Sequence, residues 1–194
     1  ISNEAKGKIP SEYDNTKRQI ILIGIARGMM LLHKFHIIHR DLKPENILLD
    51  DDLYPHITDF GLSKFFDPNH SKSQSITSDM GTVAYMAPEV INDDSFNTRA
   101  DVYAFGILML EVLTGKRAYK NILNKMTIFQ FKENVYNGLR PEIEKGSIKK
   151  SHQIMIEKCL SENPKERPTF SEIYRKLNLS TNDFLEFESQ QEPN

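Results

Sequence analysis

The sequence predicts a mainly α-helical fold with a few short β-strands near one end. Long segments carry apolar residues at helical spacing, whereas three short, largely apolar runs lie close together between turn-forming residues. With 39% hydrophobic and 27% charged residues, the chain has the composition of an ordinary globular domain. These observations favour a helical core with a small strand region.

The first helix is expected to begin at Thr16, because Thr16–Gln19 has the pattern of a capping box. It should end near His33. Its apolar stripe consists of Ile21, Ile25, Gly28 and Leu32. This spacing predicts a helix with one side packed on the core.

Short strands are predicted at residues 37–38, 47–49 and 56–58. The run Asp50–Asp52 lies between the last two, and we interpret it as a solvated hairpin turn rather than a metal site. Residues 62–82 contain many hydroxyl side chains and little periodicity, which predicts a loop.

The later helices are indicated by their own patterns. Residues 101–113, DVYAFGILMLEVL, are apolar nearly all round and predict a buried central helix, with Gly115 suited to a left-handed cap. Thr127–Gln130 and Thr169–Glu172 have capping-box patterns, and residues 151–160 predict a further helix. Together these segments make the domain mostly helical.

The predicted domain covers residues 1–178, and residues 179–194 form an acidic tail that we expect to be disordered. The net charge of −2 does not favour binding to nucleic acid or to a membrane. A single cysteine, Cys159, excludes an internal disulfide and fits the reducing cytoplasm. We therefore expect a cytoplasmic protein.

The stretch HRDLKPENILLD, residues 39–50, combines the groups that phosphoryl transfer to a hydroxyl requires. Asp41 offers a carboxylate for the attacking oxygen, Lys43 offers positive charge, and Asn46 offers an oxygen ligand. Because Mg²⁺ prefers at least one carboxylate, Asp59 after the next strand is the expected second ligand.

Three motifs in this order resemble those of the eukaryotic protein kinases. They are HRDLKPEN, DFG at residues 59–61 and MAPE at residues 86–89, separated by loop-length spacings. The resemblance covers roughly residues 10–178. Residues 101–119 and 159–170 most resemble the tyrosine-kinase-like group of serine/threonine kinases.

The resemblance implies ATP and Mg²⁺ as cofactors and protein substrates that carry Ser or Thr. It implies that Asp41 orients the substrate hydroxyl, that Asn46 and Asp59 hold Mg²⁺, and that Lys43 contacts the transferred phosphate. Lys43 and Thr82 match the serine/threonine pattern.

A regulatory role is implied for Arg40, which resembles the arginine that pairs with a phosphorylated activation loop. The candidate phosphoacceptors are Ser71, Ser73, Ser75, Thr77 and Ser78. Thr77 and Ser78 are favoured because they lie nearest the end of this segment.

Structural roles are implied for five further residues. Glu89 and Arg167 resemble a buried ion pair, and Asp101 resembles the aspartate that holds the catalytic-loop backbone. His39 and Phe60 resemble members of the hydrophobic spine.

Two alternative sites are less favoured. His33, His36 and His39 are spaced by threes, but the kinase motif accounts for His39 and no cysteine lies nearby to complete a zinc site. Cys159 is interpreted as a buried apolar residue rather than a reactive thiol.

The chain has no G-x-G segment to cover the phosphates of ATP, since no two of its nine glycines are separated by one residue. We therefore expect the large, helical C-terminal lobe of a kinase without its N-terminal β lobe, and expect these residues to be inactive by themselves. Two hypotheses remain open: part of a serine/threonine kinase completed by a missing N-lobe, or a non-catalytic lobe that binds substrates or partners.

Overall fold

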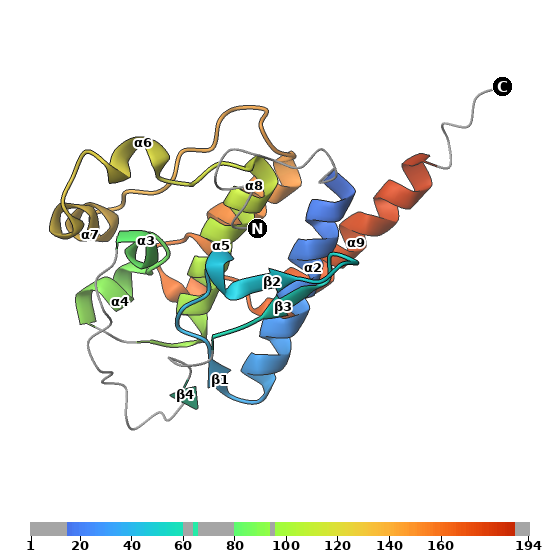
Figure 1. Cartoon of the computed structure of the whole chain (residues 1–194), viewed down its shortest axis with the longest axis horizontal. Coiled ribbons are helices and arrows are strands. Elements are labelled where there is room, and N and C mark those ends of the chain that lie inside the picture. Colours follow the sequence, from blue (N-terminus) through green and yellow to red (C-terminus); the bar gives the residue numbers. More distant parts are fainter. Residues whose placement is uncertain (1–14, 60–63, 66–79, 94–95, 189–194) are drawn as a thin grey trace.

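The structure is a computed structural model that describes residues 15–59, 64–65, 80–93 and 96–188 (Figure 1). The mainly helical fold with short strands is confirmed. Its elements are α2 (Asn15–Lys34), β1 (Ile37–Ile38), η1 (Pro44–Asn46), β2 (Ile47–Leu49), β3 (Pro55–Ile57), β4 (Lys64–Phe65), α3 (Met80–Val83), α4 (Pro88–Asp93), α5 (Thr98–Thr114), α6 (Lys120–Leu123), α7 (Ile128–Tyr136), α8 (Lys150–Cys159), η3 (Pro164–Glu166) and α9 (Phe170–Glu188).

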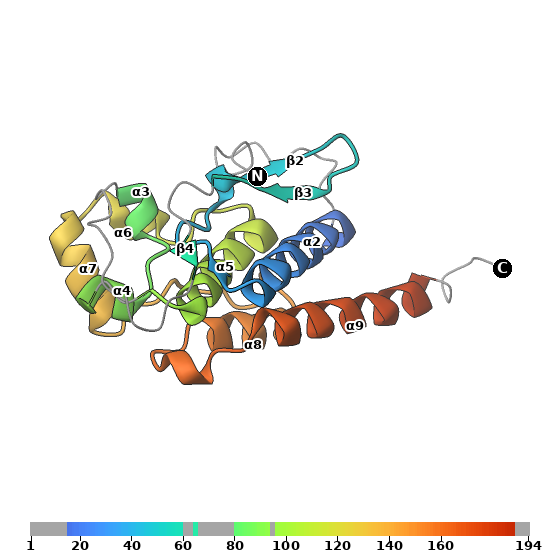
Figure 2. The same ribbon diagram turned by 90° about the horizontal axis from the view of Figure 1, so that it is seen from below.

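Helix α5 forms the centre of the domain, as its apolar sequence predicts. Every residue from 100 to 112 is buried. Asn97 caps its start by accepting a hydrogen bond from the Arg99 amide at 2.7 Å, and Gly115 ends it at φ 66°. Helices α2 and α8 pack on α5, and α9 runs along α2 (Figure 2). A helix covered on all sides gives the other elements a fixed reference.

The predicted hairpin is present, with β2 and β3 antiparallel and Ile47 opposite Ile57. Asp50 stabilises the turn because its Oδ1 accepts hydrogen bonds from the Asp52 amide at 3.1 Å and from the Tyr54 amide at 2.8 Å. Residues 50–52 therefore form the predicted solvated turn.

Three element predictions need correction. Residues 62–82 were expected to be a loop, but they include β4, which pairs with β1, and most of α3. The first helix already includes Asn15, the first described residue, so Thr16 lies within the helix rather than at its cap. The last helix continues through residues 179–188, because no Pro or Gly interrupts it, and residues 189–194 lie outside the described part of the chain.

Two of the three predicted capping boxes are confirmed, those that begin at Thr127 and Thr169, whereas Thr16 lies inside α2 and forms no cap. Thr127 and Gln130 satisfy each other's backbone amides at the start of α7. The Thr169 amide donates to the Glu172 carboxylate at 2.7 Å, while the Glu172 amide donates to the Thr169 hydroxyl at 3.2 Å. None of the helices in the described ranges is long and apolar enough to cross a membrane.

Two glycines allow the hairpin to lie directly on α2. A Cβ atom at Gly24 would lie 2.5 Å from Cγ and 2.7 Å from Cδ of Pro55. At Gly28 it would lie 2.8 Å from the Cδ1 atom of Ile57. The proline ring is rigid, so the first contact leaves no room for adjustment.

We predict that Gly24→Ala destabilises the chain by about 1–3 kcal/mol, because the overpacked Pro55 must shift the hairpin. The better helix propensity of alanine, worth about 1 kcal/mol, offsets only part of this cost. The matched control is Arg27→Ala, an exposed position of α2. Denaturant melts of the 194-residue chain measure both, and equal stability of Gly24→Ala and the parent would contradict the close packing.

Candidate active site

The backbone of the catalytic-loop segment is held by Asp101 of α5. The Oδ2 atom of Asp101 accepts hydrogen bonds from the His39 amide at 2.9 Å and from Nε2 of His33 at 2.8 Å. Its Oδ1 accepts from the Arg40 amide at 2.9 Å. Asp101 is 2% exposed, so these donors compensate the cost of burying its charge.

Arg40 adopts a left-handed backbone conformation, with φ 73°. This conformation is uncommon for a residue with a side chain. The hydrogen bond from its backbone amide to Asp101 holds this conformation, and the guanidinium lies over the Phe96 ring, 4.3 Å from the centroid. The segment therefore turns sharply just before Asp41.

His39 is completely buried beneath this turn. Its Nδ1 lies 3.3 Å from the Asp41 amide, which can only donate, and its Nε2 lies 3.1 Å from the Thr58 carbonyl, which can only accept. The ring therefore links the segment before Asp41 to the strand end that precedes Asp59.

Asp41 lies at the centre of a group of polar contacts. Its Oδ2 accepts a hydrogen bond from Nδ2 of Asn46 at 2.9 Å and forms an ion pair with Nζ of Lys43 at 2.7 Å. Lys43 also donates to the Thr82 hydroxyl at 3.0 Å. The structure thus brings together Asp41, Lys43, Asn46 and Thr82, although Thr82 lies 39 residues from Lys43.

Asn46 is held through its side-chain amide nitrogen and its backbone carbonyl. Its Nδ2 also donates to the Asp41 carbonyl at 2.7 Å, which leaves Oδ1 as the available acceptor. Its own carbonyl accepts from the Thr58 amide at 2.9 Å and from the Thr58 hydroxyl at 3.1 Å. Asp59, at φ 61°, therefore follows directly after the residue bound to Asn46.

This donor set suits a magnesium ion. The amide oxygen of Asn46 and the carboxylate of Asp59 are hard oxygen ligands, and Mg²⁺ usually keeps several waters besides one or two such groups. Asp59 is exposed, which leaves access for such waters. Within the described ranges no cluster of three or more His, Cys, Asp or Glu side chains could hold a metal ion by itself.

Some predicted site residues lie outside the described part of the chain. These are Phe60 and the candidate phosphoacceptors Ser71, Ser73, Ser75, Thr77 and Ser78. The spine role of Phe60 and the choice of phosphoacceptor therefore stay predictions, as does the pairing of Arg40 with a phosphorylated residue.

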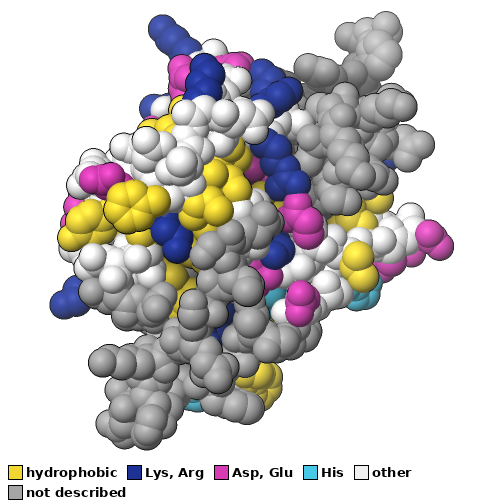
Figure 3. Space-filling model, turned by 60° about the vertical axis from the view of Figure 1, so that its left-hand side comes forward, with side chains coloured by type: hydrophobic (Ala, Val, Ile, Leu, Met, Phe, Trp, Pro, Cys, Tyr) yellow, Lys and Arg dark blue, Asp and Glu magenta, His cyan; other side chains and the backbone are white. Residues whose placement is uncertain are grey.

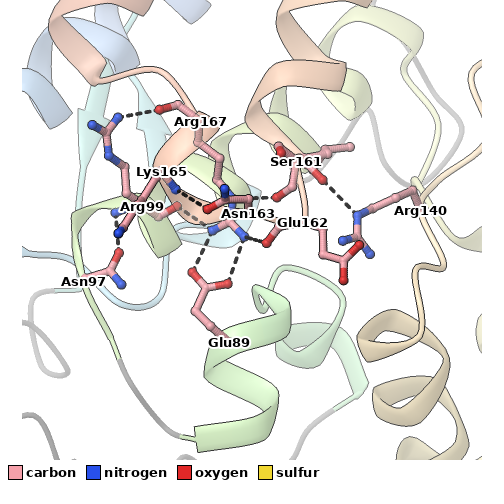
Figure 4. Close-up of polar contacts among 10 residues, drawn as sticks. Glu89, Asn97, Arg99, Arg140, Ser161, Glu162, Asn163, Lys165 and Arg167 are labelled. Carbon is pink, nitrogen blue, oxygen red and sulfur yellow. Dashed lines mark hydrogen bonds and ion pairs between the residues drawn. The ribbon is translucent and has the colours of Figure 1, made fainter.

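Arg167 and Glu89 form a bidentate ion pair (Figure 4). The two guanidinium nitrogens lie 2.7 and 2.8 Å from the two carboxylate oxygens. Arg167 is 1% exposed and also donates to the carbonyls of Ser161 at 2.9 Å and Arg99 at 3.0 Å. The pair thus joins α4 to the start of α5 and to η3.

His33 contacts Asp101, although the sequence analysis assigned His33 to no site. Its Nε2 donates to Asp101, and its ring packs edge-on against Phe170, with centroids 5.1 Å apart. The signal available in the sequence was a histidine at the end of the predicted first helix, shortly before the HRD motif at residues 39–41. Cys159 is fully buried, and burial raises the pKa of its thiol to about 12, so it is an unreactive core residue at neutral pH.

The chain is similar to known proteins of one family. The protein kinase domain family model matches residues 5–177. Cysteine-rich receptor-like protein kinase 44 of Arabidopsis thaliana is 36% identical over 87% of this chain and 48% of its own length.

Two further relatives come from the same plant. LRR receptor-like serine/threonine-protein kinase ERL1 is 38% identical over 81% of this chain and 17% of its own length. G-type lectin S-receptor-like serine/threonine-protein kinase At1g11410 is 37% identical over 84% of this chain and 21% of its own length. The chain therefore spans less than half of each of these three relatives.

We predict that Glu89→Ala destabilises the chain by about 3–5 kcal/mol, because it leaves the buried Arg167 guanidinium without its carboxylate. The matched control is Glu144→Ala, whose ion pair with Lys116 has side chains 65% and 62% exposed and should contribute at most about 1 kcal/mol. Urea unfolding measures both free energies. Equal losses in the two variants would show that burial does not set the strength of the Glu89 pair.

Proposed function

This chain belongs to the protein kinase family, and from that premise we propose that it is the large lobe of a serine/threonine protein kinase. The observation that carries the proposal is the contact group around Asp41, in which Lys43 and Asn46 meet one carboxylate oxygen. Phosphoryl transfer depends mainly on positioning and on charge stabilisation, and this group supplies both.

In the proposed reaction Asp41 orients the hydroxyl of a protein substrate. Its Oδ2 is engaged by Lys43 and Asn46, while its Oδ1 accepts no hydrogen bond from the described residues. Oδ1 is therefore the atom that receives the hydroxyl proton or holds its hydrogen bond. Lys43 places positive charge beside the transferred phosphate.

Asn46 and Asp59 would hold Mg²⁺, and the bound Mg-ATP supplies the phosphoryl group together with charge neutralisation. Thr58 and His39 keep these two ligands in place through the hydrogen bonds that join them to the catalytic segment. The residues of this chain thus serve to position the metal and the hydroxyl.

Specificity for Ser and Thr is supported by the Lys43–Thr82 contact and by relatives that are named serine/threonine kinases. We further propose that the lobe works in the cytoplasm and that Arg40 binds a phosphate on Thr77 or Ser78. The single cysteine and the position of Arg40 one residue before Asp41 support these proposals.

These 194 residues contain the catalytic and metal groups without a G-x-G segment. We therefore propose that efficient transfer needs further residues, which grip adenine and the α- and β-phosphates.

We predict that Asp41→Asn in the catalytically active form of the protein lowers phosphoryl transfer at least about 100-fold, because asparagine cannot accept the hydroxyl proton. The fold should persist, since asparagine keeps an oxygen for Asn46 and Lys43. The matched control, Asp52→Asn in the exposed hairpin turn, should keep the parent rate. Transfer of labelled phosphate from Mg-ATP to a general Ser/Thr protein substrate measures the rate, and unchanged turnover would remove Asp41 from this role.

A second candidate function is a non-catalytic lobe that binds a substrate or partner. Phe129 and Tyr136 of α7 are 75% and 50% exposed, which is unusual for large aromatic side chains. Figure 3, which brings the α3, α4, α6 and α7 side forward, shows hydrophobic side chains gathered on this face. Such a surface favours binding to another protein.

Nucleotide binding separates the two candidates for the isolated chain. We predict that millimolar Mg-ATP raises the melting temperature of the 194 residues by less than about 1 °C, because most of the nucleotide contacts are not in this segment. Mg-ADP and magnesium chloride alone are the controls. A rise of several degrees with Mg-ATP would show that this lobe binds the nucleotide without help and would favour the catalytic function.

A further inference from the structure

Glu111, a buried carboxylate on α5, belongs to a polar network that has no role in the proposed reaction as described above. Glu111 is 6% exposed. Its Oε2 accepts a hydrogen bond from the Tyr85 hydroxyl at 2.7 Å, and its Oε1 accepts from the Ala118 amide at 2.9 Å. Burial raises the pKa of the Glu111 carboxyl and of the Tyr85 hydroxyl, so both need polar partners.

Arg117 extends this network to the surface. Its Nη1 donates to the Tyr85 hydroxyl at 2.6 Å and lies 3.6 Å from Oε2 of Glu111. Its Nη2 donates to Oε1 of Glu45. Arg117 therefore donates to Tyr85, Tyr85 donates to Glu111, and one guanidinium faces two carboxylates. We call these four residues, Glu45, Tyr85, Glu111 and Arg117, the Arg117 bridge.

The two ends of the Arg117 bridge lie beside the proposed site. Glu45 is in the short helix η1, directly before Asn46, whose amide holds Asp41. The backbone amide of Tyr85 donates a hydrogen bond to the Thr82 carbonyl at 3.1 Å, and the Thr82 hydroxyl accepts one from Lys43. The bridge thus connects the segment that carries Asp41 and Asn46 with the segment that carries Thr82.

We infer that Arg117 is a positioning residue, which sets the spacing between these two segments and so determines how a protein substrate meets Asp41. This inference rests on the proposed function. It does not depend on a large ion-pair energy, since the side chains of Arg117 and Glu45 are 31% and 41% exposed. What matters is geometry, because one planar guanidinium reaches both Glu45 and Tyr85.

Loss of Arg117 should also disturb the buried end of the bridge. Without the guanidinium, the Tyr85 hydroxyl loses its donor, and the buried Glu111 carboxylate loses the cation that lies 3.6 Å from its Oε2. The backbone between Thr82 and Tyr85 is then free to shift relative to Lys43. A shift of this kind weakens substrate binding before it weakens nucleotide binding.

The first test compares Arg117→Ala, Arg117→Lys and the matched control Lys116→Ala in the catalytically active form of the protein. Lys116 is the neighbouring residue, and its exposed ion pair with Glu144 lies outside the Arg117 bridge. We expect Arg117→Ala to raise the KM for the protein substrate about tenfold and to leave the KM for Mg-ATP within about twofold of the parent. Arg117→Lys should recover part of the loss, because lysine keeps the charge but reaches one partner, and Lys116→Ala should match the parent.

Three outcomes of this test would overturn the inference: an unchanged KM for the protein substrate, equal increases in both KM values, or the same effect in Lys116→Ala. An equal rise in both values with a lower melting temperature would indicate a purely structural role.

The second test needs no catalytic activity. In the 194-residue chain, hydrogen exchange is measured at the amides of residues 43–46 and 82–86. Arg117→Ala should accelerate exchange about tenfold or more in both segments, whereas Lys116→Ala should change neither. Unchanged exchange in Arg117→Ala would overturn the inference. If the parent protein transfers no phosphate, the proposed function fails, while the exchange rates still decide whether Arg117 positions the two segments.

Discussion

The arrangement of the site depends on one buried carboxylate, that of Asp101. It accepts hydrogen bonds from the backbone amides of His39 and Arg40 and contacts His33. The conformation of the loop before Asp41 is therefore fixed, because the amides of His39 and Arg40 both donate to this buried carboxylate. Since Asp101 belongs to a helix buried on all sides, the core of the domain determines the position of this loop.

The same helix controls two other parts of the site through polar residues set in an apolar sequence. Arg99, near its start, donates to the Arg167 carbonyl at 2.6 Å and accepts from Arg167 at its own carbonyl. Glu111, near its end, holds Tyr85 and faces Arg117. Asp101, Arg99 and Glu111 thus anchor three different segments, so a single rigid element sets the relation among them.

Sequence reasoning located what depends on local spacing. Of the contacts between distant segments, the family resemblance gave those of Asp101 with the catalytic loop and of Glu89 with Arg167, and the others were missed. The buried helix around Asp101 and the hairpin turn followed from composition and periodicity. β4 was missed because a two-residue strand exists only through its pairing with β1. Asp41, Lys43 and Asn46 were found because they are close in the chain. Arg117 was missed because only the fold brings its guanidinium to Glu45, 72 residues away.

Backbone strain gives a physical reason why the site needs this external support. Arg40 and Asp59, which flank the catalytic segment, have φ values of 73° and 61°. Such conformations cost about 1–3 kcal/mol each in residues other than glycine. The Asp101 hydrogen bonds offset the cost at Arg40, and the two bonds from Thr58 to Asn46 hold the chain just before Asp59. A substitution that removed the Asp101 carboxylate would therefore release the turn at Arg40, and the position of Asp41 relative to Asn46 and Asp59 would be lost before the helical core unfolded.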